Sequence, residues 1–369
     1  MNTNSHPSKK ALLYDPYLDV VGGGEQHMLT ILKIMEKAGY QVHIAWHDTN
    51  ILNKIQETLG IRFANPIIEK ELFHAPQNPI KRAFMLSQFD TLFYIPDGSY
   101  FFSLAKHNFL YAMVPSFQLY PHTSLDKLKF HNWNIIANSQ FTKQWLATWG
   151  HTSIVHYPSV SDSSLALFDP PAKEQLILSV GRFFKHLHNK KQKELIETFI
   201  KLQQSCPAYA KYRLVVAGGL KAEDQEYFDE LKSLAQAHPS VTLLANAPFD
   251  SLQQLYKRAE FFWHMTGLGV DQELHPEQVE HFGITPLEAM AAGCVVCAYN
   301  AGGPREIIQN TRTGYLFDNP EQLIEQMTQL SLEKNNERRQ VSQAAHDYVK
   351  REFSITSFQK HLFDDIITS

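Results

Sequence analysis

The sequence predicts an α/β protein built from two doubly wound domains. Apolar runs of strand length alternate with amphipathic helical patterns in both halves of the chain, which is typical of parallel sheets covered by helices. The chain has 369 residues, more than one hydrophobic core usually organises. Near the middle, the polar segment SDSSLALFDPPAKEQ predicts a linker. We therefore expect one domain over residues 1–165 and a second over residues 166–345.

The composition excludes several classes of protein. Hydrophobic residues make up 44% and charged residues 20%, as in an ordinary globular protein. The formal net charge of -4 argues against a nucleic-acid partner. The three cysteines suggest a reducing compartment, and the polar start MNTNSHPSKK and the lack of long apolar runs predict neither a signal peptide nor a spanning helix. We expect a cytoplasmic protein, with at most peripheral contact with a membrane.

The first domain opens with a β-loop-α-β unit. ALLYDPY predicts a strand, VVGGGEQHMLTILKIMEKAGY a glycine loop and an amphipathic helix, and YQVHIAW a second strand. Gly22 and Gly23 permit a close approach of the backbone, and the helix N-terminus after them could face a phosphate. A tight turn that merely needs glycine is the alternative. The predicted buried face of the helix consists of Met28, Ile31, Leu32 and Met35.

The rest of the first domain is less regular. ILNKIQETLG predicts a short helix and IRFANPI a strand, while EKELFHAPQNPIKRAFMLSQ favours an ordinary helix-and-loop excursion over a loop that lines an acceptor site. TLFYIPDGSYFF, NFLYAMVPSF, NIIANSQFTKQWLATWG and SIVHYPSV each contain a further strand. The carboxyl ends of such strands converge on the crevice where open α/β sheets bind ligands.

The second domain repeats the pattern and adds basic residues at strand ends. LILSVGRF predicts a strand that ends near Arg182, KHLHNKKQ a basic loop, and ELIETFIKLQQ a helix. YRLVVAGGL predicts a strand with a glycine exit at Gly218, and VTLLANAP, EFFWHMT and GYLF predict further strands. Arg182 and a lysine of the loop could meet a diphosphate together. The histidines of HLH and the cysteines of CVVC lack further ligands nearby in the sequence, so we expect no metal site.

The most informative stretch is HPEQVEHFGITPLEAMAAGCVVCAYNAGGPREII. Thr285 is the predicted N-cap of a helix over 286–292, Glu288 falls three residues after that cap, and Gly293 is the predicted terminator. A helix N-terminus with Glu280 and Glu288 beside it suits a sugar nucleotide, because N–H groups bind the diphosphate and carboxylates bind hydroxyls. The alternative is a capping box with a purely structural role.

EHFGITPLEAMAAGCVV resembles the donor-site signature of retaining glycosyltransferases of the GT-B fold, family 4, also called glycosyl transferases group 1. The resemblance implies two Rossmann-like doubly wound domains that face each other across a cleft, with a helix in residues 346–369 returning to the first domain. The first domain would bind the acceptor and the second the donor. The implied reaction moves a hexose from a UDP- or GDP-sugar to a glycan or lipid-linked saccharide, without a metal or other cofactor.

The resemblance also implies roles for individual residues. Glu280 would hold hydroxyls of the donor sugar, while Arg182 and Lys190 would stabilise the departing diphosphate. Lys191 competes with Lys190 for that role, and Glu288 would hold the ribose hydroxyls. Further implied substrate-binding residues are Gly22, Gly23, Gly24, Met113, Gly218, Phe282, Gly283, Ile284 and Thr285.

The sequence departs from the family at Tyr111 to Pro115, which reads YAMVP. The family commonly has a histidine where this chain has Met113, and a thioether neither carries a proton nor donates a strong hydrogen bond. Either the main-chain carbonyl suffices, or a histidine such as His122 substitutes, or activity is weak. Two alternatives to a transferase follow: a non-catalytic nucleotide-sugar-binding protein or partner of an active transferase, and an enzyme that acts on the nucleotide sugar itself.

Overall fold

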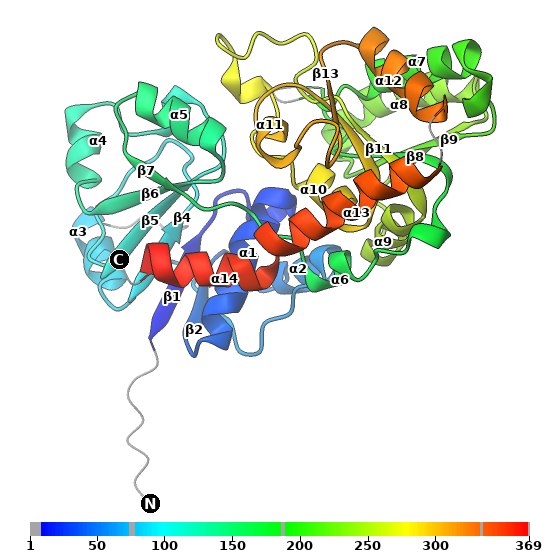
Figure 1. Cartoon of the computed structure of the whole chain (residues 1–369). Helices are drawn as coiled ribbons and strands as arrows, with labels where there is room; N and C mark the ends of the chain where they lie inside the picture. The colour runs from blue at the N-terminus through cyan, green and yellow to red at the C-terminus, as the bar shows by residue number, and fades with distance from the viewer. Residues whose placement is uncertain (1–8, 74–77, 186–188, 333–334, 368–369) are drawn as a thin grey trace, which may run out of the picture. The chain divides into compact units, whose positions relative to one another are not determined.

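The computed structural model describes residues 9–73, 78–185, 189–332 and 335–367. The chain divides into two compact units, one made of Met1–Tyr157 with Gln359–Ser369 and the other of Pro158–Phe358 (Figure 1). The polar start of the chain and the HLH histidines lie outside the described residues. Among the described residues, no helix combines the length and apolarity needed to cross a membrane.

The first unit contains a seven-stranded parallel sheet with the order β3-β2-β1-β4-β5-β6-β7. Its order reverses between β1 and β4, which is the topological switch point where open sheets bind ligands. The strands are β1 Lys10–Tyr14, β2 Gln41–Ala45, β3 Ile67–Ile68, β4 Thr91–Tyr94, β5 His107–Ala112, β6 Trp133–Ala137 and β7 Ser153–Val155.

Helices of the first unit connect these strands (Figure 1). They are α1 Gly23–Lys37, α2 Ile51–Leu59, α3 Pro79–Leu86, α4 Ser124–Lys129 and α5 Gln140–Thr148. The predicted apolar face of α1 is confirmed, since its four named side chains have no exposed surface. The predicted strand IRFANPI is wrong in extent, because only Ile67 and Ile68 pair. Pro66 has no N–H for the ladder, and Phe63 is buried without pairing.

The second unit contains a six-stranded parallel sheet with the order β10-β9-β8-β11-β12-β13. Its order reverses between β8 and β11, so this sheet has a switch point of its own. The strands are β8 Glu174–Val180, β9 Arg213–Gly218, β10 Val241–Ala245, β11 Ala259–His264, β12 Val295–Tyr299 and β13 Tyr315–Phe317. The predicted α/β class with two doubly wound sheets is confirmed.

The second unit has helices before, between and after its strands. They are α6 Asp162–Leu165, α7 Gln192–Ser205, α8 Gln225–Gln236, α9 Phe249–Arg258, α10 Ile284–Ala291, α11 Pro304–Ile307, α12 Pro320–Leu332, α13 Asn335–Glu352 and α14 Ile355–His361, the last of which continues into the first unit. The segment predicted as a linker is folded instead. Ser161 caps α6, and the Phe168 ring stacks on His346 at 4.2 Å, so this stretch packs on the second unit.

Candidate functional site

The candidate site of the second unit lies at the switch point of its sheet. Gly181 and Arg182 follow β8, and His264 is the last residue of β11, so residues from neighbouring parallel strands end at the same edge. The loop with Glu280 follows β11 and leads into α10. Parallel sheets place ligand-binding residues at this edge, because the strand order separates the covering helices there.

Glu280 is the centre of a buried group of charged and titratable side chains. Lys190 Nζ donates to Glu280 Oε2 at 2.7 Å, and His264 Nε2 lies 3.0 Å from the same oxygen. The Glu280 side chain is 15% exposed and that of His264 is 3% exposed. Among the residues that the structure describes, none donates to Glu280 Oε1. This oxygen is therefore available to accept a hydrogen bond from a ligand hydroxyl.

Two opposing effects set the pKa of Glu280. Burial alone would raise the pKa of this carboxyl, but Lys190 and the contact with His264 outweigh burial and hold the pKa well below its usual range. Burial lowers the pKa of His264, against the opposing effect of Glu280, so the imidazole is neutral at pH 7. The group therefore presents a carboxylate, an ammonium and a neutral imidazole.

Two glycines let Lys190 reach Glu280. The stem of Lys190 lies across Gly181, where a Cβ would be 2.8 Å from Lys190 Cγ. Gly218 at the end of β9 is in turn pressed against the Gly181 carbonyl, with which any Cβ at position 218 would collide. The contact gives a structural reason for glycine at position 218, and the predicted substrate-binding role of Gly218 stays a prediction. A side chain at Gly181 would push Lys190 away from the carboxylate, and one at Gly218 would displace the backbone of Gly181.

The structure separates the two lysines that the sequence left as alternatives. Lys191 starts α7 with a left-handed backbone, at φ 56°, and its Nζ lies 3.7 Å from Glu194 on the same helix. Lys190 alone of the two is brought to Glu280. Arg182 lies beside Gly181, with its guanidinium carbon 5.4 Å from the centre of the Phe184 ring and its carbonyl accepting from Gln192 Nε2 at 2.8 Å.

The start of α10 differs from the prediction. The helix begins at Ile284, and its N-cap is Gly283 with a left-handed φ of 105° and no side-chain cap. Thr285 is therefore inside the first turn and is not the N-cap, and Glu288 is too far along the helix for a capping box. Without a side-chain cap, the first N–H groups of α10 are left for another acceptor. The predicted stop at Gly293 is confirmed by its φ of 78°.

The loop before α10 is held by a second pair of glycines. The N–H of Gly303 donates to the carbonyl of Glu280 at 2.8 Å, and a Cβ at Gly302 or Gly303 would collide with the loop backbone. The Phe282 side chain is 2% exposed and its ring centre lies 6.0 Å from that of Phe353. Phe282 therefore anchors the loop by its side chain, which does not face solvent.

Glu288 has a different partner from Glu280. Tyr256 on α9 donates its phenol to Glu288 Oε2 at 3.0 Å, and the Tyr256 side chain is buried. Lys173 Nζ donates to the carbonyls of Tyr256 at 3.1 Å and of Ala292 at 2.8 Å, so one ammonium caps the ends of α9 and α10. This contact ties together the two helices that carry the Tyr256–Glu288 pair.

In the first unit the predicted glycines and Met113 come together. Gly22 is the N-cap of α1, and its N–H donates to Glu25 Oε2 at 2.6 Å, whereas Gly23 and Gly24 already belong to the helix. A Cβ at Gly24 would lie 2.7 Å from Met113 Sδ. The thioether therefore packs on the start of α1. The predicted glycine loop is shorter than expected, because the helix begins at Gly23, where the Glu25 side chain accepts from the N–H of the N-cap Gly22.

His264, Tyr256 and Lys173 were not predicted as site residues. His264 left a signal in the sequence, since EFFWHMT places a histidine after an apolar strand whose end meets the site. Tyr256 and Lys173 left none, because their partners depend on packing between distant helices. His122, considered as a substitute for the family histidine, is exposed, and its Nδ1 lies 3.0 Å from the Tyr120 carbonyl. Within the described ranges, no three His, Cys, Asp or Glu residues gather as a metal site would require.

Comparison with known proteins gives three kinds of match. Residues 166–348 match the family model described as glycosyl transferases group 1. The chain is 32% identical over 262 residues to the alpha-1,3/1,6-mannosyltransferase ALG2 of Rhizomucor pusillus, covering 62% of this chain and 56% of that protein. It is 28% identical to the GDP-Man:Man(3)GlcNAc(2)-PP-Dol alpha-1,2-mannosyltransferase of Mus musculus, covering 61% of this chain and 46% of that protein.

The similarity to solved structures covers nearly the whole chain. The crystal structure of HepE of Anabaena in complex with UDP and glucose superposes with a TM-score of 0.70 at 15% identity, covering 98% of this chain and 100% of that one. At this identity the likeness shows a common fold. The chain spans about half the length of the curated relatives that it matches.

Proposed function

The chain belongs to the family of glycosyl transferases group 1, through its residues 166–348, and on that premise we propose that it is a hexosyltransferase of the GT-B fold. It takes a hexose from a nucleoside diphosphate sugar and transfers it, with retention of configuration, to a glycan or lipid-linked saccharide. The observation that carries the proposal is the group formed by Lys190, Glu280 and His264 beside the uncapped start of α10.

In this proposal each residue acts by electrostatics or hydrogen bonding. Glu280 accepts from hydroxyls of the donor sugar through Oε1. Arg182, Lys190 and the N–H groups at Ile284 and Thr285 stabilise the negative charge that grows on the diphosphate as the glycosidic bond breaks. These groups supply leaving-group stabilisation without a divalent ion or other cofactor. Glu288 accepts from the ribose hydroxyls.

The first unit has a separate role in the proposal. We assign the acceptor to the first unit, with Gly22, Gly23, Gly24 and Met113 in contact with substrate, and the donor to the second. The donor base is proposed to be guanine and the sugar mannose, because two relatives are named mannosyltransferases and one name prints GDP-Man. HepE, crystallised with UDP and glucose, makes UDP-glucose the competing donor. The proposed place of action is the cytoplasm, in peripheral contact with the membrane that carries the acceptor.

A panel of UDP-, GDP- and ADP-sugars tests the proposal. We expect one donor to raise the melting temperature and to release its nucleoside diphosphate when a saccharide acceptor is added. Glu288→Ala and Arg182→Ala are expected to abolish the thermal shift. If both variants bind the donor as the parent does, the site assignment is wrong.

The competing function is non-catalytic binding of nucleotide sugars, and Met113 favours it. A stable donor complex without hydrolysis or transfer, across a broad set of acceptors, would support this function. Met113→His separates the two candidates further. In a transferase this substitution restores the family pattern and should not lower turnover, whereas in a binding protein it leaves the thermal shift unchanged and creates no turnover.

A further inference from the structure

The exposed large hydrophobic side chains are concentrated in the first unit. In the second unit, only Leu274 and Leu332 of the described residues are large hydrophobics with such exposure. Several in the first unit lie on α3, on α4 and in the segment between β4 and β5. Large hydrophobics exposed together on one part of a surface commonly mark an interaction site.

α3 presents two of these side chains on one face. Ile80 is 68% exposed and Phe84 is 66% exposed, and they stand one helical turn apart. The opposite face of the helix buries Ala83 and Leu86 in the unit. Lys81, beside Ile80, is exposed as well. The outward face of α3 is thus apolar with a cation at its edge.

α4 also exposes large hydrophobic side chains beside lysines. None of its residues is buried, and Leu125 and Leu128, one turn apart, are each 57% exposed. Lys127 and Lys129 flank the leucines. The only acid of α4, Asp126, accepts from the N-cap hydroxyl of Thr123 at 2.5 Å, so its charge is held at the helix start.

A chain of ring contacts joins α3 to the end of α4. The Arg82 guanidinium lies 5.5 Å from the centre of the Phe101 ring, and Phe101 meets Trp133 at 5.4 Å. Trp133 stacks at 4.7 Å on Phe130, the residue that ends α4. The segment between β4 and β5 adds Phe102, 38% exposed, and Leu104, 50% exposed. Figure 1 shows α3 and α4 on the same side of the first unit.

We propose that this face, made of Ile80, Phe84, Leu125 and Leu128 with Lys81, Lys127 and Lys129, docks on a bilayer that contains anionic phospholipids. The chain has a net charge of -4, yet the face itself carries three lysines against one capped acid. Large aliphatic and aromatic side chains enter the boundary between headgroups and acyl chains, and the lysines bind the headgroup phosphates. This proposal rests on the proposed function in one respect, namely that the acceptor is lipid-linked. Its other support is the set of exposed side chains described above.

Sedimentation with vesicles tests the proposal without donor or acceptor. The full-length chain is mixed with phosphatidylcholine vesicles, or with phosphatidylcholine vesicles that include phosphatidylglycerol. We expect binding to the second kind, weakened about tenfold by Ile80→Ser with Phe84→Ser, and likewise by Leu125→Ser with Leu128→Ser. Lys127→Glu with Lys129→Glu should weaken it at least about fivefold for each charge. Leu274→Ser with Leu332→Ser is the matched control, which should bind as the parent does.

Three results would overturn the proposal. The parent fails to bind anionic vesicles; both serine pairs bind as well as the parent; or the serine pairs abolish a concentration-dependent dimer while no vesicle binds, which would assign the face to a second copy of the chain. The named substitutions fall on exposed side chains and on the partly exposed Lys129, so circular dichroism should show an unchanged fold. Donor-dependent release of nucleoside diphosphate in solution is measured separately, so a failure of docking is distinguishable from a failure of the proposed chemistry.

Discussion

Glu280 and Glu288 belong to one motif, yet the protein holds them in different ways. Glu280 lies in the loop before α10, is nearly buried, and shares Oε2 between Lys190 and His264. Glu288 lies on α10, is half-buried, and takes a hydrogen bond from the neutral phenol of Tyr256. Two glutamates of one motif can therefore have different partners, which their spacing does not reveal.

The difference follows from the free energy of desolvation. A carboxylate removed from water needs an opposite charge and hydrogen bonds, or it becomes protonated. Glu280 stays ionised because Lys190 and His264 compensate burial, which keeps its pKa low. Glu288 keeps contact with solvent, which reduces its cost of desolvation, and the neutral Tyr256 phenol donates to it. We therefore expect the Glu280 group to respond strongly to loss of charge and the Glu288 pair to respond weakly.

The largest expected effect is that of Lys190→Met. This change leaves the Glu280 carboxylate buried without its ammonium partner, and we expect a loss of about 3 kcal/mol in the free energy of unfolding at pH 7. The depressed pKa of Glu280 contributes stability above the unfolded pKa of about 4.3, and this contribution is lost as pH falls through the folded pKa. The difference between parent and variant should therefore shrink below about pH 4.3 in urea unfolding.

Lys191→Met is the matched control for this prediction. Among the residues that the structure describes, Lys191 forms an ion pair with Glu194 alone, on its own helix, so its removal should change stability by less than about 0.5 kcal/mol. Donor binding should be lost in Lys190→Met and kept in Lys191→Met. Equal losses in the two variants would contradict the assignment of Lys190 to the site.

The second effect concerns His264. His264→Leu removes the polar side chain that lies 3.0 Å from Glu280 Oε2, and we expect donor affinity to fall about tenfold, whereas His264→Gln keeps a polar side chain there and should lose less. Isothermal titration with the donor measures both. If His264 has only a structural role, the two variants should lose the same donor affinity.

A pH series of unfolding gives an independent measure of the same residue. The pKa of His264 is lowered in the folded state, so the unfolded state binds the proton first, and parent stability falls as pH drops through the unfolded pKa of about 6.5. His264→Gln lacks this contribution. Its stability should fall less steeply below that pH, by up to about 1.4 kcal/mol per pH unit. Parallel curves for parent and variant would contradict the neutral state of His264.

The smallest effect is expected for Tyr256→Phe. The loss of one hydrogen bond to a half-buried carboxylate should lower the free energy of unfolding by about 1 kcal/mol and donor affinity by a few-fold. Tyr212→Phe is the matched control, since Tyr212 donates to Glu260 at 2.5 Å elsewhere in the same unit. The control should lose similar stability and no donor affinity. If Tyr256→Phe lost as much donor affinity as Lys190→Met, the two glutamates would not differ in their response to loss of a partner, and the comparison would be wrong.

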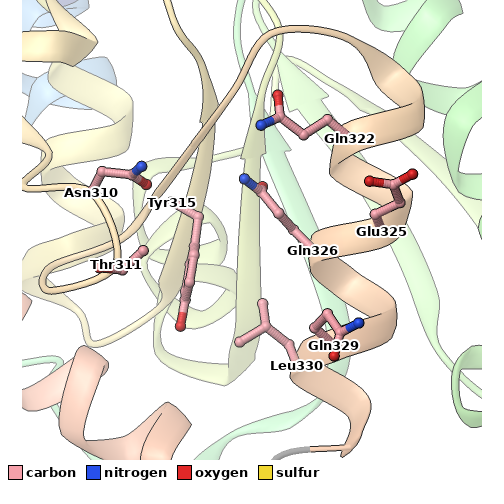
Figure 2. A pocket seen from close by; sticks show the side chains of 8 residues that line it. All are labelled: Asn310, Thr311, Tyr315, Gln322, Glu325, Gln326, Gln329 and Leu330. Atoms are coloured by element: carbon pink, nitrogen blue, oxygen red, sulfur yellow. The ribbon is translucent and has the colours of Figure 1, made fainter.

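One polar hollow of the second unit shows how an edge strand is protected. Figure 2 shows Asn310, Tyr315 and Gln326 among the residues that line it, between β13 and α12. Asn310 Oδ1 accepts from the Leu316 N–H at 3.0 Å, and Gln326 Nε2 donates to the Leu316 carbonyl at 2.8 Å. Side-chain amides thus form hydrogen bonds with main-chain groups of the edge strand. These groups are then not available to pair with another strand, which discourages aggregation.

Much of the fold was predictable from local patterns. The burial of one face of α1, the stop of α10 at Gly293 and the parallel alternation of strands and helices follow from apolar periodicity and from glycine at a left-handed position. The start of α10 was predicted wrongly, because Thr285 resembles an N-cap while Gly283 adopts the left-handed backbone that begins the helix. That backbone depends on the Gly302–Gly303 turn packed against the loop, which lies far along the sequence.

The sequence by itself determined which residue types are present at the strand ends: two carboxylates, an arginine and a pair of lysines around a helix start. Only the tertiary structure decided that Lys190 and not Lys191 meets Glu280, that His264 shares the same oxygen, and that Tyr256 holds Glu288. The physical reason is that periodicity and capping act within a few residues. Ion pairing in a buried site instead depends on strands and helices that are brought together only when the sheet forms. It also depends on Gly181 and Gly218, which leave room for the Lys190 side chain.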